Sequence, residues 1–200
     1  INQAKELEVS LIIFDDELSP AQIKNYSNLT ENIKVIDRST LILDIFKQHA
    51  KTKEAKTQVE LAQLEYMLPR LTRAWTHLER QMGGIGTRAG AGETQIEVDR
   101  RLIRTRISKL KKELDKIDKE RYTQRKHREN IFKVALVGYT NAGKSTLMKT
   151  ISGADVFIQD QLFATLDTTT RSVDLDNSHR ILLSDTVGFV RKLPHHLIAS

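Results

Sequence analysis

A chain of 200 residues is long enough for one large domain or two small ones, and its formal net charge of +6 points to an anionic partner. The absence of cysteine excludes disulfide scaffolds, thiol catalysis and cysteine-ligated zinc. The apolar runs are too short to cross a bilayer and no signal peptide precedes them, so we expect a cytoplasmic protein that does not insert into membranes. We also expect it to be monomeric.

Residues 1–50 are predicted to form a small α/β unit. Two short apolar runs, at 9–14 and 34–37, are typical of strands. Ser19 precedes a proline and is predicted to cap a helix after the first run, and Ser39 is predicted to cap another helix after the second run. The order strand, helix, strand, helix favours a two-layer parallel arrangement.

Residues 51–130 are predicted to form a helical hairpin. Apolar residues recur three and four positions apart over 51–82 and again over 97–129, which is typical of two long helices that pack against each other in antiparallel fashion. The glycine-rich segment 83–92 between them predicts a flexible loop, and Pro69 predicts a bend in the first helix. The seam residues are Leu61, Leu64, Leu68, Leu71, Trp75, Leu78 and Met82, then Ile103, Ile107, Leu110, Leu114 and Ile117.

The positive charge is concentrated on the second of these helices. From Asp99 to Glu129 there are 13 Lys and Arg residues against 6 Asp and Glu residues, which leaves +7 in this segment and −1 in the rest of the chain. Contact with nucleic acid and a merely solvated helix face are both compatible with this charge. The densest cations are Arg100, Arg101, Arg104, Arg106, Lys109, Lys111 and Lys112.

Residues 131–200 are predicted to form a P-loop nucleotide-binding domain. The run Gly138–Ser145 matches the pattern G-x-x-x-x-G-K-[ST], with an apolar strand at 132–137 before it and a helical stretch after it. A glycine turn that arose by chance is the alternative, and the strand, the helix and the Lys-Ser pair together argue against it. We therefore expect a nucleoside polyphosphate bound with Mg²⁺.

Each residue type in the motif has a chemical reason. Gly138 and Gly143 are expected to allow backbone torsions and a close approach that a side chain would block. Lys144 is expected to place a positive charge at the β- and γ-phosphates, and the Ser145 hydroxyl to ligate Mg²⁺. The residues expected around the phosphates are Gly138, Tyr139, Thr140, Asn141, Ala142, Gly143, Lys144, Ser145 and Thr146.

A D-x-x-G motif, Asp185–Gly188, follows a second predicted strand at 180–184. An acid at a strand end suits the Mg²⁺ shell, and a flexible glycine after it suits a γ-phosphate sensor. The motif is weak alone, and its position 41 residues after Lys144 strengthens it. Between the two motifs, the hydroxyl-rich stretch 162–171 is predicted to be a loop that offers a second Mg²⁺ ligand, with an ordinary turn as the alternative.

These motifs together resemble the translation-factor-related GTPases, and the upstream segments closely resemble the HflX family of ribosome-associated GTPases. The segments that carry the resemblance are G-Y-T-N-A-G-K-S, F-A-T-L-D and D-T-V-G-F, and upstream W-T-H-L, G-I-G-T-R, G-E-T-Q and D-R-R-L-I. The resemblance covers essentially the whole chain. It implies an α/β fold: an N-terminal HflX domain made of the small α/β unit and the hairpin, then a P-loop GTPase domain with a mostly parallel sheet.

The resemblance also implies a function. Family members hydrolyse GTP to GDP with Mg²⁺, bind the large ribosomal subunit and its rRNA, and act in splitting or rescuing stalled ribosomes. Carried over by position, Lys144, Thr165 and Gly188 are the expected catalytic residues, and Ser145, Thr165 and Asp185 the expected Mg²⁺ ligands. The nucleotide contacts expected beyond the P-loop are Phe163, Ala164, Thr165, Leu166, Asp167, Asp185, Thr186, Val187 and Gly188.

Three positions depart from related patterns. Phe189 stands where Ras-like enzymes carry a water-positioning glutamine, and a phenyl ring cannot orient water by hydrogen bonding. Slow intrinsic hydrolysis, raised when the ribosome orders the switches, is therefore expected. The family usually has proline where Ala91 and Thr168 stand, so we expect both segments to be looser here.

The chain contains no N-K-x-D motif, and residues 131–200 are about half of a usual domain. We therefore expect a GTPase domain that is incomplete at its C-terminus, and a start at Ile1 predicts truncation or processing. Guanine specificity rests on the resemblance alone. A P-loop ATPase that remodels RNA with Lys144, Ser145 and Asp185, and a non-catalytic RNA-binding module, stay open as alternatives.

Overall fold

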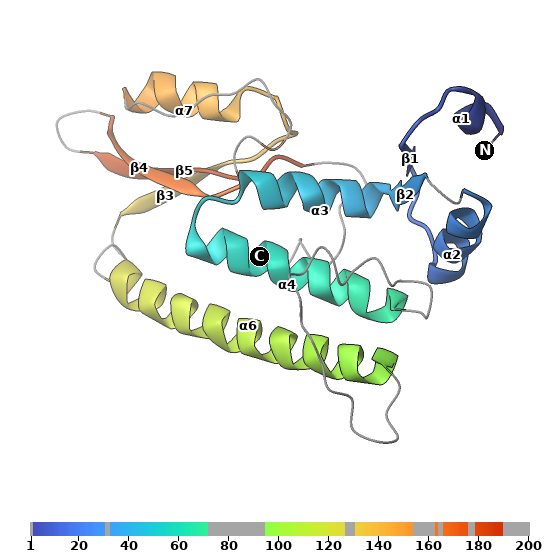
Figure 1. The fold of residues 1–200 in the computed structure, drawn as a ribbon. Coiled ribbons are helices and arrows are strands. Elements are labelled where there is room, and N and C mark those ends of the chain that lie inside the picture. Colours follow the sequence, from blue (N-terminus) through green and yellow to red (C-terminus); the bar gives the residue numbers. More distant parts are fainter. Residues whose placement is uncertain are drawn as a thin grey trace. The chain divides into compact units, whose positions relative to one another are not determined.

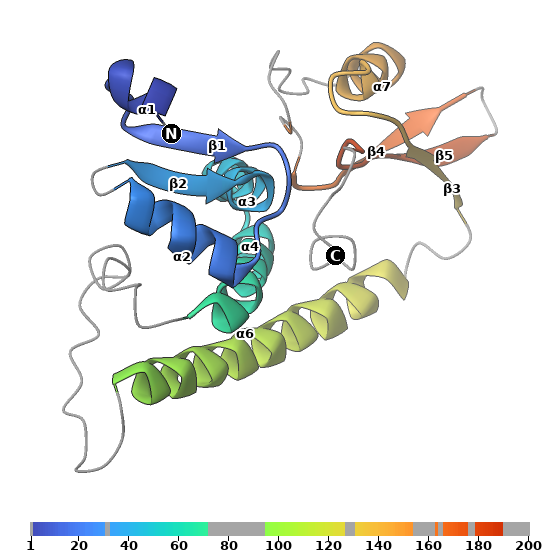
Figure 2. The same ribbon diagram turned by 90° about the vertical axis from the view of Figure 1, so that its right-hand side faces the viewer.

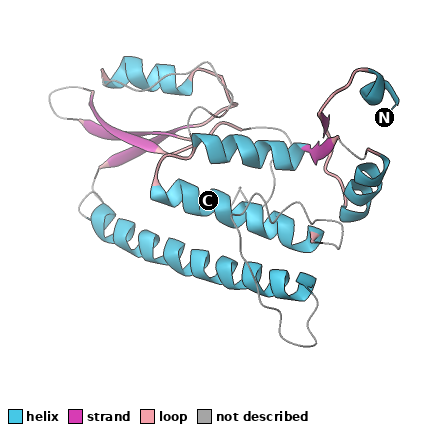
Figure 3. Cartoon of the chain, in the orientation of Figure 1, coloured by secondary structure: helices cyan, strands magenta, loops and turns pink. Residues whose placement is uncertain are grey.

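The computed structural model describes residues 2–30, 33–71, 95–126, 131–153, 163, 166–175 and 179–189. The chain divides into two compact units, each built from two stretches of sequence: residues 1–43 with 61–111, and residues 44–60 with 112–200. Helices and strands occur in both units, which confirms the predicted α/β class (Figures 1 and 3). Among the described helices, none combines the length and the apolar character needed to span a bilayer.

The first unit contains the predicted pair of parallel strands. Helix α1 (Asn2–Glu6) precedes strand β1 (Leu11–Phe14), and helix α2 (Pro20–Leu29) leads to strand β2 (Lys34–Asp37), which pairs with β1 in parallel (Figure 2). Strand β1 begins later than predicted because the amide of Val9 donates a hydrogen bond of 3.2 Å to the carbonyl of Ala4 and closes the turn after α1. The predicted parallel arrangement is confirmed.

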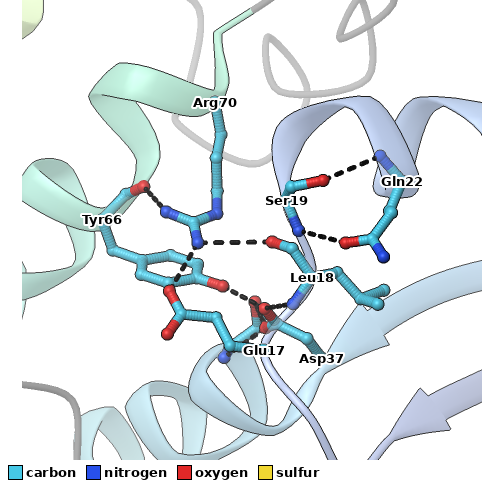
Figure 4. Close-up of polar contacts among 8 residues, drawn as sticks. Glu17, Leu18, Ser19, Gln22, Asp37, Tyr66 and Arg70 are labelled. Carbon is cyan, nitrogen blue, oxygen red and sulfur yellow. Dashed lines mark hydrogen bonds and ion pairs between the residues drawn. The ribbon is translucent and has the colours of Figure 1, made fainter.

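Helix α2 begins as predicted. The hydroxyl of Ser19 accepts a hydrogen bond of 3.3 Å from the amide of Gln22, and the side chain of Gln22 accepts one of 2.8 Å from the amide of Ser19 (Figure 4). This reciprocal pair is a capping box, and Pro20 occupies the first turn, where the missing amide hydrogen costs nothing.

Helix α3 (Arg38–His49) corrects one prediction, because Ser39 lies inside it and does not cap it. The acceptor at its start is Asp37, whose Oδ1 accepts hydrogen bonds from the amide of Thr40 at 2.9 Å and from its hydroxyl at 2.7 Å. Either residue is a good cap by type, and a carboxylate fits the positive N-terminal end of a helix better than a hydroxyl.

Asp37 also joins the end of β2 to α4 through a buried polar network in the first unit (Figure 4). Its Oδ2 accepts hydrogen bonds from the amide of Leu18 at 3.1 Å and from the hydroxyl of Tyr66. Arg70 stacks on the Tyr66 ring at 3.5 Å, donates to the Tyr66 carbonyl at 2.9 Å and pairs with Glu17 at 2.7 Å. The carboxylate of Asp37 is fully buried, and it is stable there only because hydrogen-bond donors surround it.

Helix α4 (Lys53–Met67) is shorter than the helix predicted over this region. It ends at Met67 and continues as a single 3₁₀ turn, η1 (Leu68–Arg70), after which Leu71 is extended. Pro69 therefore ends the helix and does not merely bend it, because proline lacks an amide hydrogen and its ring disfavours a helical residue before it. The rest of that predicted helix and the glycine-rich loop fall in residues 72–94, outside the described residues.

Helix α6 (Gln95–Lys126) confirms the second long helix. In the first unit it packs against the end of α4 and η1 through the predicted seam. The earlier residue of α6 contacts the later residue of the partner segment: Arg100 donates to the carbonyl of Leu71 at 2.9 Å, and Lys111 pairs with Glu65 at 2.8 Å. These two contacts confirm antiparallel packing over this stretch. The apolar residues in contact are Leu61, Leu64, Leu68, Leu71, Ile103, Ile107 and Leu110.

The second unit contains a three-stranded sheet in the order β3-β5-β4. Strand β3 (Phe132–Leu136) pairs with β5 (Arg180–Asp185) in parallel, and β4 (Thr169–Asp174) pairs with β5 in antiparallel fashion. Helix α7 (Lys144–Ser152) follows β3 and packs on the sheet. The core between them is formed by Met148, Val173 and Leu183, with Val134, Leu136 and Ile181 partly buried against it.

Strand β4 begins inside the stretch predicted to be a loop. Val173 is its only buried residue, so its sequence lacks the apolar alternation that predicts a strand. Its pairing with β5 creates the strand instead, and the last residues of the ladder, Asp174 and Arg180, form an ion pair of 2.6 Å across it.

Candidate nucleotide-binding site

The loop between β3 and α7 contains the predicted P-loop. Gly143 lies at the N-terminus of α7 with φ +83°, a left-handed conformation that glycine adopts without strain. Asn141 also has a positive φ of 60°. Gly138 shows neither the special torsion nor a close approach to other atoms of the protein. A methyl group there would meet no atom closer than 3.8 Å, and its φ is not left-handed. The torsional argument therefore applies to Gly143 alone.

Lys144 folds back over this loop. Its Nζ donates hydrogen bonds to the carbonyl oxygens of Gly138 at 3.2 Å and Tyr139 at 2.8 Å. The ammonium charge is thereby held beside the N-terminal end of α7, where backbone amides also present positive charge. An anion placed in this loop would meet both.

Ser145 and Asp185 bring a hydroxyl and a carboxylate together. The Ser145 hydroxyl donates a hydrogen bond of 2.5 Å to Asp185 Oδ2, and Asp185 is fully buried as the last residue of β5. In the ladder its partner is Leu136, the last residue of β3, so both strand ends lie at the carboxyl edge where ligands of α/β sheets bind.

This pair of oxygens fits Mg²⁺. Magnesium prefers hard oxygen ligands and is usually held by one or two carboxylates together with phosphates and water. Within the described ranges, no group of three or more histidine, aspartate or glutamate side chains is arranged to hold a metal. Ser145 and Asp185 would therefore hold the ion with help from a bound phosphate and not as a self-contained metal cage.

The D-x-x-G segment pairs directly with the P-loop. The amide of Thr140 donates to the carbonyl of Phe189 at 3.1 Å, and the amide of Phe189 donates to the carbonyl of Gly138 at 2.9 Å. A methyl group on Gly188 would lie 2.5 Å from the Cα atom of Thr140, closer than packed atoms allow. The hydroxyl of Thr186 donates to the carbonyl of Leu136 at 2.7 Å. The two predicted motifs therefore form one backbone-paired structure.

The predicted second loop is only partly described. Ala164 and Thr165 lie outside the described residues, and Leu166 is half-buried. Two residues expected at the nucleotide contact other parts of the second unit in this structure: Phe163 contacts the C-terminal end of α3, and Asp167 contacts the turn after α3. No motif or periodicity predicts these contacts, because their partners lie more than a hundred positions earlier in the chain. The remaining expected nucleotide contacts lie in the P-loop and D-x-x-G segments described above. They are Tyr139, Thr140, Asn141, Ala142, Thr146, Thr186 and Val187.

A second candidate surface is the basic face of α6. Between Arg100 and Lys112 the helix carries no acidic residue. Arg100 is half-buried and binds the Leu71 carbonyl, and Lys111 pairs with Glu65. The cations that are exposed are Arg101, Arg104, Arg106, Lys109, Lys111 and Lys112.

Family models match three consecutive parts of the chain. The model described as the N-terminal region of GTP-binding GTPases matches residues 1–47, and the model of their middle region matches residues 49–128. The model described as a 50S ribosome-binding GTPase matches residues 133–199.

Curated relatives and a solved structure are similar along nearly the whole chain. The GTPase HflX of Flavobacterium psychrophilum is 58% identical over 192 residues, which are 96% of this chain and 46% of that protein. The GTPase HflX of Escherichia coli is 54% identical over 198 residues, 98% of this chain and 46% of that protein. The chain thus spans about half the length of the curated relatives it matches. A crystal structure of SsGBP in complex with GDP is 29% identical with a TM-score of 0.53, covering 99% of this chain and 52% of that one.

Proposed function

Since the chain belongs to the HflX family of GTPases, we propose that its P-loop binds GTP and that the protein hydrolyses GTP to GDP and phosphate with Mg²⁺. The observation that carries the proposal is the hydrogen bond of 2.5 Å between the Ser145 hydroxyl and Asp185 Oδ2, beside the N-terminus of α7. The similar protein SsGBP, solved with GDP, supports guanosine nucleotide as the ligand.

The roles of the residues follow from their chemistry. Lys144 exchanges its contacts with the Gly138 and Tyr139 carbonyls for the β- and γ-phosphates, and the amides at the start of α7 bind the remaining phosphate oxygens. Ser145, Asp185 and Thr165 would hold Mg²⁺, which when bound would supply positive charge against the phosphates. Gly188 binds the γ-phosphate through its amide.

Phe189 makes intrinsic hydrolysis slow. Its ring is exposed, and a phenyl group has no donor or acceptor with which to orient an attacking water. A partner that orders the switch segments must supply what the ring lacks. Both the amide and the carbonyl of Phe189 are hydrogen-bonded to the P-loop, so a change at the nucleotide reaches this residue directly.

We further propose that the partner is the large ribosomal subunit and its rRNA, and that the protein acts in splitting or rescuing stalled ribosomes. The acid-free basic face of α6 and the match to a family described as 50S ribosome-binding GTPases support this partner. We also propose that the protein works in the cytoplasm, where ribosomes are, and that it acts as a monomer. The spans of the three family models support the division into an α/β unit at 1–50, a hairpin at 51–130 and a GTPase domain from 131 onward.

Single-turnover GTP hydrolysis by the full-length protein tests this proposal, with and without purified large subunits. We expect slow turnover alone, faster turnover with the subunits, and loss of both in Lys144→Ala. Lys149→Ala, an exposed lysine on the same helix, is the matched control. Equal turnover of ATP would favour an RNA-remodelling ATPase, and subunit binding without any turnover would favour a non-catalytic RNA-binding module.

A further inference from the structure

The segment that enters β4 is held at two points, one by the C-terminal end of α3 and one by the turn that follows it, and all of these residues belong to the second unit. The first point is Phe163, which is only 4% exposed. Its ring packs edge-on against Phe46 at 4.6 Å, and its carbonyl accepts a hydrogen bond of 2.8 Å from His49 Nδ1. Phe163 has a φ of 58°, which residues with a side chain rarely adopt and keep only where their surroundings hold them.

The second point is Asp167. Its carboxylate accepts hydrogen bonds from the amides of Lys51 at 3.1 Å and Thr52 at 3.2 Å, and from the Thr52 hydroxyl. The same hydroxyl accepts a hydrogen bond of 3.1 Å from the amide of Ala55, so Thr52 caps α4. The carboxylate therefore lies at the positive end of a 15-residue helix.

These two anchors lie on either side of Thr165, the expected switch threonine. In the sequence, Thr165 is two residues from Phe163 and two from Asp167. The chain then enters β4 at Thr169, whose partner in the ladder is Asp185. The anchored segment thus leads directly to the strand edge that carries the proposed Mg²⁺ ligand.

We propose that His49, at the C-terminal end of α3, and Thr52, in the turn before α4, position the segment that includes the expected switch threonine for GTP hydrolysis. The two anchors persist when GTP is bound and hold the segment near its reactive position, so less ordering is needed at the moment of reaction. His49 and Thr52 are positioning residues, since they touch neither the nucleotide nor Mg²⁺. This inference rests on the proposed GTPase function and adds to it a dependence on residues outside the nucleotide-binding motifs.

The engagement of Asp167 favours this role over direct nucleotide contact. Both of its carboxylate oxygens accept hydrogen bonds from the cap of α4. A charge that is already satisfied by three donors at a helix N-terminus would lose those bonds to reach a ligand. The buried ring of Phe163 would likewise have to leave its contact with Phe46.

The test compares Thr52→Ala and His49→Ala with wild type in the full-length protein. We expect single-turnover hydrolysis at saturating GTP to fall about tenfold in each, because misplacement of a reacting group by even a fraction of an ångström lowers the rate. The dissociation constant for GDP should stay within about twofold, since the P-loop contacts are untouched. Thr52→Ser should restore the rate, and Lys56→Ala, an exposed residue one turn into the same helix, should leave it unchanged.

Thr52→Ala also removes the cap of α4, so a second comparison separates positioning from folding. Asp167→Ala cuts the same anchor and leaves the hydrogen bond from Ala55 to Thr52 in place. The double variant Thr52→Ala/Asp167→Ala should hydrolyse GTP no more slowly than either single variant, because both remove one interaction. Hydrolysis at or above the wild-type rate in Thr52→Ala and His49→Ala would overturn the inference. A wild-type protein that does not hydrolyse GTP would instead overturn the proposed function.

Discussion

Gly188 and Thr140 approach so closely that a methyl group on Gly188 would lie 2.5 Å from the Thr140 Cα atom. This approach lets the backbone of Phe189 pair with the P-loop on both sides of Tyr139. The D-x-x-G motif therefore needs its glycine even before any nucleotide is considered.

Alanine at the three glycines of the site should have graded effects on the free energy of unfolding. Gly188→Ala should cost ~3 kcal/mol, since the backbone of Thr140 must move. Gly143→Ala should cost ~1 kcal/mol, because the residue has φ +83° and open space around it. Gly138→Ala should change stability by less than ~0.5 kcal/mol. Urea unfolding of the nucleotide-free variants measures all three, and a Gly138→Ala effect as large as that of Gly188→Ala would contradict this geometry.

Asp37 should make stability depend on acid pH. Burial alone would raise the pKa of Asp37, but hydrogen bonds from Tyr66, Thr40 and Leu18 outweigh it and hold the pKa below its ordinary 3.8. The unfolded chain therefore binds a proton more readily, so this stabilisation is complete above about pH 4 and is lost as the pH falls through the lowered folded-state pKa.

Asp37→Asn should accordingly lower the free energy of unfolding by ~3 kcal/mol at pH 7, because it breaks several charge-assisted hydrogen bonds inside the first unit. The difference in the free energy of unfolding between Asp37→Asn and wild type should become smaller as the pH falls below 4. Urea unfolding across pH 3 to 7 measures it. Asp15→Asn is the control, since Asp15 is exposed and pairs with Arg38 at 2.5 Å, where ~0–1 kcal/mol is expected. A gap between Asp37→Asn and wild type that is independent of pH would contradict the assignment.

The basic face of α6 should bind the large subunit through phosphate contacts. Arg104→Ala combined with Lys109→Ala should weaken binding and lower the slope of log K against log salt by about 1 for each cation removed. Lys116→Ala is the matched control, because Lys116 lies further along the helix beside Glu120 and other acids. Co-sedimentation at several salt concentrations measures the slope. An unchanged slope in the double variant would mean that this face is only solvated.

The placement of three site residues could be predicted because it is encoded locally. Lys144 and Ser145 follow a strand and a glycine turn, and Asp185 ends the neighbouring strand, so their positions depend on a few consecutive residues. Strand β4 could not be predicted, since its ladder with β5 and not its own apolar pattern creates it. The contacts of His49 and Thr52 join positions more than a hundred residues apart, which no periodicity or spacing reveals.

Competition between similar residues explains the remaining errors. Asp37 and Ser39 are both good helix caps, and only the hydrogen bonds of Asp37 to Thr40 decide between them. The bend predicted at Pro69 was wrong, because the helix ends before it and continues only as the 3₁₀ turn at Leu68–Arg70.

Calorimetric titration of the full-length protein with GTP and Mg²⁺ tests the central claim most directly. The account predicts saturable binding of GTP and GDP, no displacement by excess ATP, and at least tenfold weaker binding in Lys144→Ala, since a charge-assisted phosphate contact is worth about 1.5–3 kcal/mol. No heat from GTP or ATP at any concentration of magnesium would contradict it.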